Sequence, residues 1–221
     1  MIPFYFGASD QRLYGVYEAA HNRKARDQAV VLCNPIGNEH IHAHRTMRNL
    51  SSQLSKAGIH VLRFDYFGSG DSSGEANEGD PQRWCDDIRS AASELREMTG
   101  AARMSLVGLR FGANLAAQVA ADLPKVVSLV LWDPLHASDE AVDDNTVHDP
   151  QSLATFLATA SVVSLPARTL VLTTAKETSP AVWEGAFVKY LPSPSPWLDR
   201  FFEPKIIPVD AVNFIVRWLQ S

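Results

Sequence analysis

The sequence lacks long basic runs, long apolar stretches and a framework of cysteines. Its 20 Lys and Arg stand against 25 Asp and Glu, and without a basic stripe we expect no nucleic-acid binding. No apolar stretch reaches the ~18 residues that a membrane span requires, and two cysteines form no disulfide framework. The first residues also lack the basic and apolar regions of a secretory signal. These absences predict a cytoplasmic protein without a membrane span.

The residues that are present favour one α/β domain. Hydrophobic residues make up 46% of the 221, which suffices for a full core, so we expect a single domain over residues 1–221. Short apolar strands alternate with helical segments, and this predicts a mostly parallel sheet of about eight strands with helices on both faces. The expected strands cover residues 2–6, 13–19, 29–33, 59–65, 104–109, 126–132, 169–174 and 183–191. The expected helices cover residues 40–56, 81–99, 151–160 and 209–219, with another directly after residue 110.

One stretch, Leu-Val-Gly-Leu-Arg-Phe-Gly-Ala-Asn-Leu-Ala over residues 106–116, has the layout of a nucleophile elbow. In that motif, Gly-x-Ser-x-Gly, an apolar strand turns sharply into a helix and exposes a serine at the turn. The strand, the two glycines and the alanine-rich helix are all here, but the middle position holds Arg110.

With this stretch and the loop Val61-Leu-Arg-Phe-Asp-Tyr-Phe-Gly-Ser-Gly-Asp-Ser72, nearly the whole chain resembles the α/β-hydrolase fold. The branch it resembles contains serine-aminopeptidase-like and acylglycerol-lipase-like proteins. Asn34-Pro-x-Gly-x-Glu39, Arg63-Phe-Asp-Tyr66 and Gly-Leu-Arg110 together are similar to the hydrolase-like proteins associated with exosortase systems and some biosynthetic clusters. This resemblance implies the fold, and it leaves the reaction open.

The resemblance also implies a minimal lid. Most lids of this fold enter after the sixth strand, where only residues 133–168 are available. We therefore expect a short cap insertion over about residues 135–168 with one short helix, and a shallow, open pocket.

A serine triad needs a hydroxyl on the elbow, a histidine within hydrogen-bond reach and an acid that orients it. In this fold the histidine lies after the last strand, here about residues 192–208, and that segment contains none. At the acid position after the seventh strand, only Glu177 is available. The ordinary triad is therefore not expected. The seven histidines are at positions 21, 40, 42, 44, 60, 136 and 148.

Other reactive groups have simpler interpretations. Gly70-Asp-Ser-Ser-Gly74 favours a hydrogen-bonded turn, and Cys33, at the end of a strand, favours a small buried hydrophobe. His40 and His44 share a helical face but lack a convincing third ligand, so no metal is expected. No cofactor motif occurs. Four aromatic residues favour packing over an acyl pocket; they are Trp132, Trp197, Phe201 and Phe202.

Arg110 requires an anionic partner because a cation at a helix N-terminus is unfavourable. Within the chain the candidates are Glu39 and Asp133, and outside it a ligand carboxylate or phosphate held by the guanidinium. By family analogy, the backbone N–H groups of Phe111 and Ile36 occupy the oxyanion-hole position. We expect these residues and Asn34 to form a ligand site for a small acyl or anionic compound.

Three functions remain open. The first is binding or processing of a small acyl compound (an ester, thioester or carboxylate) in a biosynthetic pathway, with Arg110 at the elbow. The second is a non-catalytic pseudohydrolase that serves as a partner or scaffold, with a protein partner or a second copy bound. The third and least favoured is a conventional esterase with a displaced serine or cysteine nucleophile.

Overall fold

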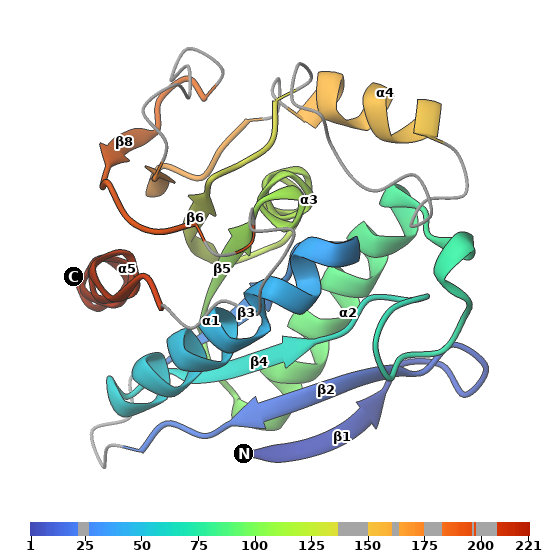
Figure 1. Cartoon of the computed structure of the whole chain (residues 1–221). Coiled ribbons are helices and arrows are strands. Elements are labelled where there is room, and N and C mark those ends of the chain that lie inside the picture. The colour runs from blue at the N-terminus through green and yellow to red at the C-terminus, as the bar shows by residue number, and fades with distance from the viewer. Residues whose placement is uncertain (22–26, 137–149, 161–163, 175–182, 196, 198–206) are drawn as a thin grey trace.

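The computed structural model of the chain describes residues 1–21, 27–136, 150–160, 164–174, 183–195, 197 and 207–221. Within them, one eight-stranded sheet lies between two layers of helices (Figure 1). The strand order is β1-β2-β4-β3-β5-β6-β7-β8. The first two strands pair antiparallel, β2 is antiparallel to β4, and all later pairs are parallel. The predicted sheet is confirmed. Its strands are β1 Ile2–Phe6, β2 Leu13–Glu18, β3 Gln28–Cys33, β4 His60–Phe64, β5 Arg103–Leu109, β6 Val126–Trp132, β7 Thr169–Thr173 and β8 Phe187–Tyr190.

The helices cover both faces of this sheet, as the alternating sequence predicted. α1 (Gly37–Lys56) and α5 (Val209–Gln220) lie together on one face. α2 (Pro81–Thr99), α3 (Phe111–Ala120) and α4 (Pro150–Ala160) lie together on the other. A short 3-10 turn, η1 (Ala76–Glu78), precedes α2. α3 and α1 pack against opposite faces of the central strands, and they begin shortly after the carboxyl ends of β5 and β3.

Side chains of the central strands feed both hydrophobic cores because successive residues of a strand point to opposite faces. In β3, Val30 and Leu32 join the core beneath α1 and α5, whereas Val31 and Cys33 join the core beneath α2 and α3. A strand buried on both faces reads as a continuous apolar run, which is why Ala29 to Cys33 was recognisable in the sequence. The double burial fixes the carboxyl ends of β3, β5 and β6 side by side.

Local signals set the ends of α2. The carboxylate of Asp80 accepts hydrogen bonds from the N–H groups of Gln82 and Arg83, and Pro81 occupies the first turn, where no N–H is needed. Gly100 ends the helix in the left-handed conformation (φ 66°) that glycine adopts without strain.

Two elements begin three or more residues away from the predicted start, whereas the other boundaries agree to within one residue. α1 begins at Gly37 rather than at residue 40, so Glu39 lies in the first helical turn and not in a loop. A carboxylate is favourable there because the helix N-terminus carries partial positive charge. β8 begins at Phe187 rather than at residue 183, because a turn at Gly185 (φ 81°) interrupts the extended run and Trp183 packs into the core.

The segment between β6 and β7 contributes α4, whose position matches the expected short helix. Residues 137–149 and 161–163 of the expected cap lie outside the described part of the chain. α4 rests on α3 and α2, and the ring of Phe156 lies 5.6 Å from the ring of Phe111. No helix among the described residues is both long and apolar enough to cross a bilayer.

Candidate functional site

The turn between β5 and α3 has a backbone conformation that few side chains adopt. Arg110, the N-cap of α3, has φ 55° and ψ −126°. Its N–H donates to the carbonyl of Trp132 on β6 (2.9 Å), and its carbonyl accepts from the N–H of Ala113 (2.9 Å). A non-glycine residue in such a region costs on the order of 1–3 kcal/mol. The turn thus has the sharp strand-to-helix form that the Gly-x-x-x-Gly pattern predicted.

Two glycines allow this turn to fit against its neighbours. A Cβ on Gly108 would overlap the backbone of Gly112 and Ala113. A Cβ on Gly112 would overlap the backbone carbonyls of Cys33 and Asn34 at the end of β3. Backbone atoms of a packed helix and of a strand end cannot easily move aside, so the pattern is a steric requirement for bringing α3 this close to β3 and β5.

The Arg110 side chain joins three segments at the carboxyl edge of the sheet. Its Nε donates to Oε1 of Glu39 in the first turn of α1 (3.0 Å). Its Nη1 donates a longer hydrogen bond to the backbone carbonyl of Asp133, directly after β6 (3.4 Å). The side chains of Arg110 and Glu39 are 14% and 27% exposed, so the guanidinium is mostly buried but reaches solvent.

Of the two carboxylates expected beside Arg110, Glu39 forms the ion pair and the Asp133 carboxylate lies elsewhere. Asp133 is buried and has φ 43°. Its Oδ1 accepts from the N–H of Thr174 (2.7 Å), and its Oδ2 accepts from the hydroxyl of the same residue. Burial raises the pKa of Asp133, while the Thr174 hydrogen bonds and the charge of Arg110 oppose the rise. The positive φ turns this side chain toward β7, which the sequence did not reveal.

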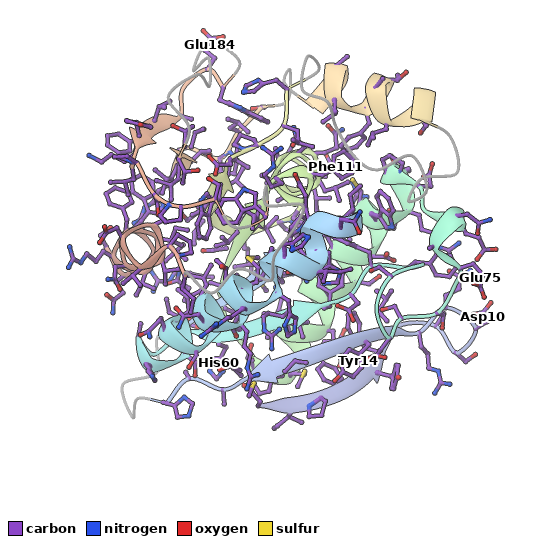
Figure 2. All side chains as sticks on the ribbon, in the orientation of Figure 1. Asp10, Tyr14, His60, Glu75, Phe111 and Glu184 are labelled. Carbon is purple, nitrogen blue, oxygen red and sulfur yellow. The ribbon has the colours of Figure 1, made fainter. Side chains whose placement is uncertain are left out.

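The remaining expected site residues line the same edge with different contacts. Asn34 is buried, and its Nδ2 donates to the carbonyl of Phe64 (2.9 Å), which ties the end of β3 to β4. The backbone N–H groups of Ile36 and Phe111 have no acceptor within the described part of the chain. Figure 2 shows Phe111 at the start of α3, and its ring lies 5.9 Å from Trp84 of α2. Phe111 therefore offers its backbone to the site and its side chain to the core.

The structure adds two residues that the sequence analysis did not select. The hydroxyl oxygens of Thr174 and Ser195 are 2.6 Å apart, so Ser195 extends the contact that Thr174 makes with Asp133. Thr174 directly follows β7, and Ser195 belongs to the segment between β8 and α5. The signal available for Thr174 was its position at the carboxyl end of a parallel strand. The expected acid Glu177 lies outside the described residues.

Other reactive groups pack as structural residues. The Sγ atom of Cys33 is fully buried, and burial raises the pKa of its thiol well above the usual range. Nε2 of His40 lies 3.5 Å from Oδ1 of Asp65, and burial lowers the pKa of His40. Among the described residues, no three of the types His, Cys, Asp and Glu gather closely enough to hold a metal ion. The rings of Trp132 and Trp197 pack edge to face at 5.1 Å, as expected; residues 201 and 202 lie outside the described part.

Comparison with known proteins agrees with this architecture. Residues 20–188 match the family model described as serine aminopeptidase, S33. A lidless α/β serine hydrolase from Xanthomonas campestris superimposes with a TM-score of 0.73 at 18% identity, covering 99% of this chain and 93% of that one. An α/β serine hydrolase homologue from Coxiella burnetii has a TM-score of 0.69 at 16% identity, covering 98% and 96%. Est1E from Butyrivibrio proteoclasticus, solved with ferulic acid bound, has a TM-score of 0.68 at 11% identity, covering 98% and 96%. No curated protein matches the chain in sequence.

Proposed function

Because this chain belongs to the serine aminopeptidase S33 family of α/β hydrolases, we propose that it binds or processes a small acyl compound at Arg110, without a serine triad. The observation that carries the proposal is the guanidinium at the apex of the elbow, which is mostly buried yet partly open to solvent. A ligand carboxylate, or the carbonyl oxygen of an ester or thioester, is the group that such a donor recognises.

The chemistry at residue 110 argues against hydrolysis through an acyl-enzyme. A guanidinium stays protonated near neutral pH, so it neither attacks a carbonyl nor accepts a proton. It can stabilise negative charge that develops on a carbonyl oxygen, which is the part of hydrolase catalysis that donor groups supply. The N–H groups of Ile36 and Phe111 are further donors for the same oxygen.

A non-catalytic role is the second candidate, and the ion pair between Arg110 and Glu39 favours it. In that case Glu39 is the permanent counter-ion of Arg110, and the pair closes the place where a nucleophile would stand. A protein of this kind would act as a partner or scaffold in a biosynthetic system.

Two measurements on the purified protein separate these functions. Octanoate is titrated while the Arg110 Nε–H signal is followed by NMR, and a fluorophosphonate probe tests for an activated serine. We expect saturable octanoate binding that Arg110→Gln weakens about 10- to 100-fold, since a hydrogen bond to a charged group is worth about 1.5–3 kcal/mol. Arg45→Gln, on the exposed side of α1, is the matched control and should leave binding unchanged.

Absence of octanoate binding in the wild type would overturn the acyl-binding proposal and favour the scaffold role. Stoichiometric labelling by the fluorophosphonate would overturn both, because it would show a nucleophilic serine that neither role includes.

A further inference from the structure

Three side chains from the segments that follow β6, β7 and β8 form a continuous chain of hydrogen bonds that starts beside Arg110. Asp133 follows β6, Thr174 follows β7, and Ser195 follows β8. The carboxylate of Asp133 accepts from the hydroxyl of Thr174, whose oxygen lies 2.6 Å from the hydroxyl oxygen of Ser195. We call these three residues the hydroxyl relay.

The direction of every hydrogen bond in the relay follows from proton counting. An ionised carboxylate only accepts, and a hydroxyl has a single proton to donate. Thr174 gives its proton to Asp133, so its oxygen must accept the proton of Ser195. Ser195 is then left with lone pairs alone. While Asp133 is ionised, the end of the relay therefore presents a hydrogen-bond acceptor.

The burial of the relay decreases toward Ser195. Asp133 and Thr174 are both 6% exposed, whereas Ser195 is partly exposed. The relay also meets the guanidinium at Asp133, because the carbonyl of that residue accepts from Nη1 of Arg110. The donor Arg110 thus contacts the backbone of Asp133, and the oriented acceptor Ser195 is linked to the carboxylate of the same residue through Thr174.

We propose that Ser195 is the specificity-determining acceptor of the Arg110 site, held in orientation by the positioning residues Thr174 and Asp133. The inference rests on the proposed function, and it names the substrate class. The preferred ligand carries a carboxylate or carbonyl for Arg110 and, next to it, a hydroxyl or N–H that donates to Ser195. The 2-hydroxy acids are the simplest compounds of this class.

The test compares octanoate with 2-hydroxyoctanoate, both enantiomers, by NMR titration at pH 8. One additional neutral hydrogen bond should make the better enantiomer bind about three- to tenfold more tightly to the wild type. Ser195→Ala and Thr174→Val should bring this ratio close to one. Thr174→Ser, which keeps the hydroxyl, should restore the preference. That rescue separates a positioning role from a general structural one.

Every outcome decides the matter. Equal binding of the two acids to the wild type, or a preference that survives in Ser195→Ala, overturns the relay proposal and leaves acyl binding at Arg110 intact. If neither acid binds the wild type, the proposed function fails, and the specificity assigned to Ser195 fails with it.

Discussion

Replacing Arg110 by serine restores the hydroxyl of a nucleophile elbow and removes one ion pair, so its effect on stability can be worked out from the contacts. The substitution deletes the 3.0 Å hydrogen bond to Glu39 and the longer one to the Asp133 carbonyl. Breaking a fully buried ion pair costs about 3–5 kcal/mol. Here Glu39 is 27% exposed and stays at the N-terminus of α1, where a carboxylate is favourable. We therefore expect a loss of about 1–2 kcal/mol, below that range.

Thermal unfolding measures this loss. A domain of about this length changes its Tm by roughly 2–4 °C for each kcal/mol, so Arg110→Ser should unfold about 2–8 °C lower. A double-mutant cycle with Glu39→Gln isolates the pair, and we expect a coupling energy of about 1 kcal/mol. The matched control is Arg89→Ser, because Arg89 pairs with Asp86 at 2.7 Å but on the surface. Exposed pairs contribute about 0–1 kcal/mol, so the control should change the Tm less.

The same variant should not hydrolyse p-nitrophenyl acetate appreciably. The sequence after β8 contains no histidine to act as its general base, and such assistance is typically worth about 10²–10⁴-fold. A Tm equal to or above that of the wild type, with zero coupling to Glu39, would show that the ion pair does not hold these segments together. An efficient esterase would show that a base is present near residue 110, and the assignment of the site would be wrong.

Three further substitutions test other parts of the structure. Burial raises the pKa of Asp87 from 3.8 to about 6, so the unfolding free energy should fall as the pH rises from 4 to 6. Asp87→Asn removes this loss. The unfolding free energy of the variant should therefore exceed that of the wild type by up to ~3 kcal/mol at pH 8 and by little at pH 4. Equal pH profiles in urea unfolding would contradict this. Gly112→Ala places a Cβ against two backbone carbonyls and should yield little folded protein by circular dichroism. Gly100→Ala has open space around the added Cβ, so this control should fold and lose only the stability that a left-handed backbone costs alanine. Asn114→Ala leaves the buried N–H and carbonyl of Leu135 without partners and should lower the unfolding free energy by about 2–4 kcal/mol in chemical denaturation. A denaturation midpoint equal to that of the wild type would contradict this.

The central strands were predictable because they are buried on both faces of the sheet. The apolar runs at Ala29 to Cys33 and Leu106 to Leu109 are typical of strands covered on both sides, and both segments are buried in the structure. The glycines of the elbow were equally readable, since both prevent a steric overlap that only glycine avoids. The sequence was a poorer guide to where some elements begin. α1 starts three residues early, at Gly37, whose positive φ (59°) the sequence pattern did not indicate.

The sequence indicated which residues lie near Arg110 better than it indicated the contacts that they make. Residues at the carboxyl ends of parallel strands meet at one edge of the sheet, which brought Arg110, Glu39 and Asp133 together as expected. Which carboxylate pairs with Arg110 depends on the backbone at Asp133, whose positive φ directs the side chain to Thr174. Such a dihedral follows from the complete packing and not from residue type. The contact between Thr174 and Ser195, which are 21 residues apart in the sequence, likewise could be recognised only in the structure.

The close approach of α3 to the ends of β3 and β5 has a consequence for how this scaffold changes over evolution. The glycines that permit the approach lie on either side of residue 110 and contact backbone, so the shape of the turn depends on packing within the sheet and not on the side chain at its tip. The backbone at position 110 therefore accepts different side chains. A hydroxyl, a thiol or a guanidinium can occupy this position on the same backbone, so the side chain there can change in evolution without refolding the domain.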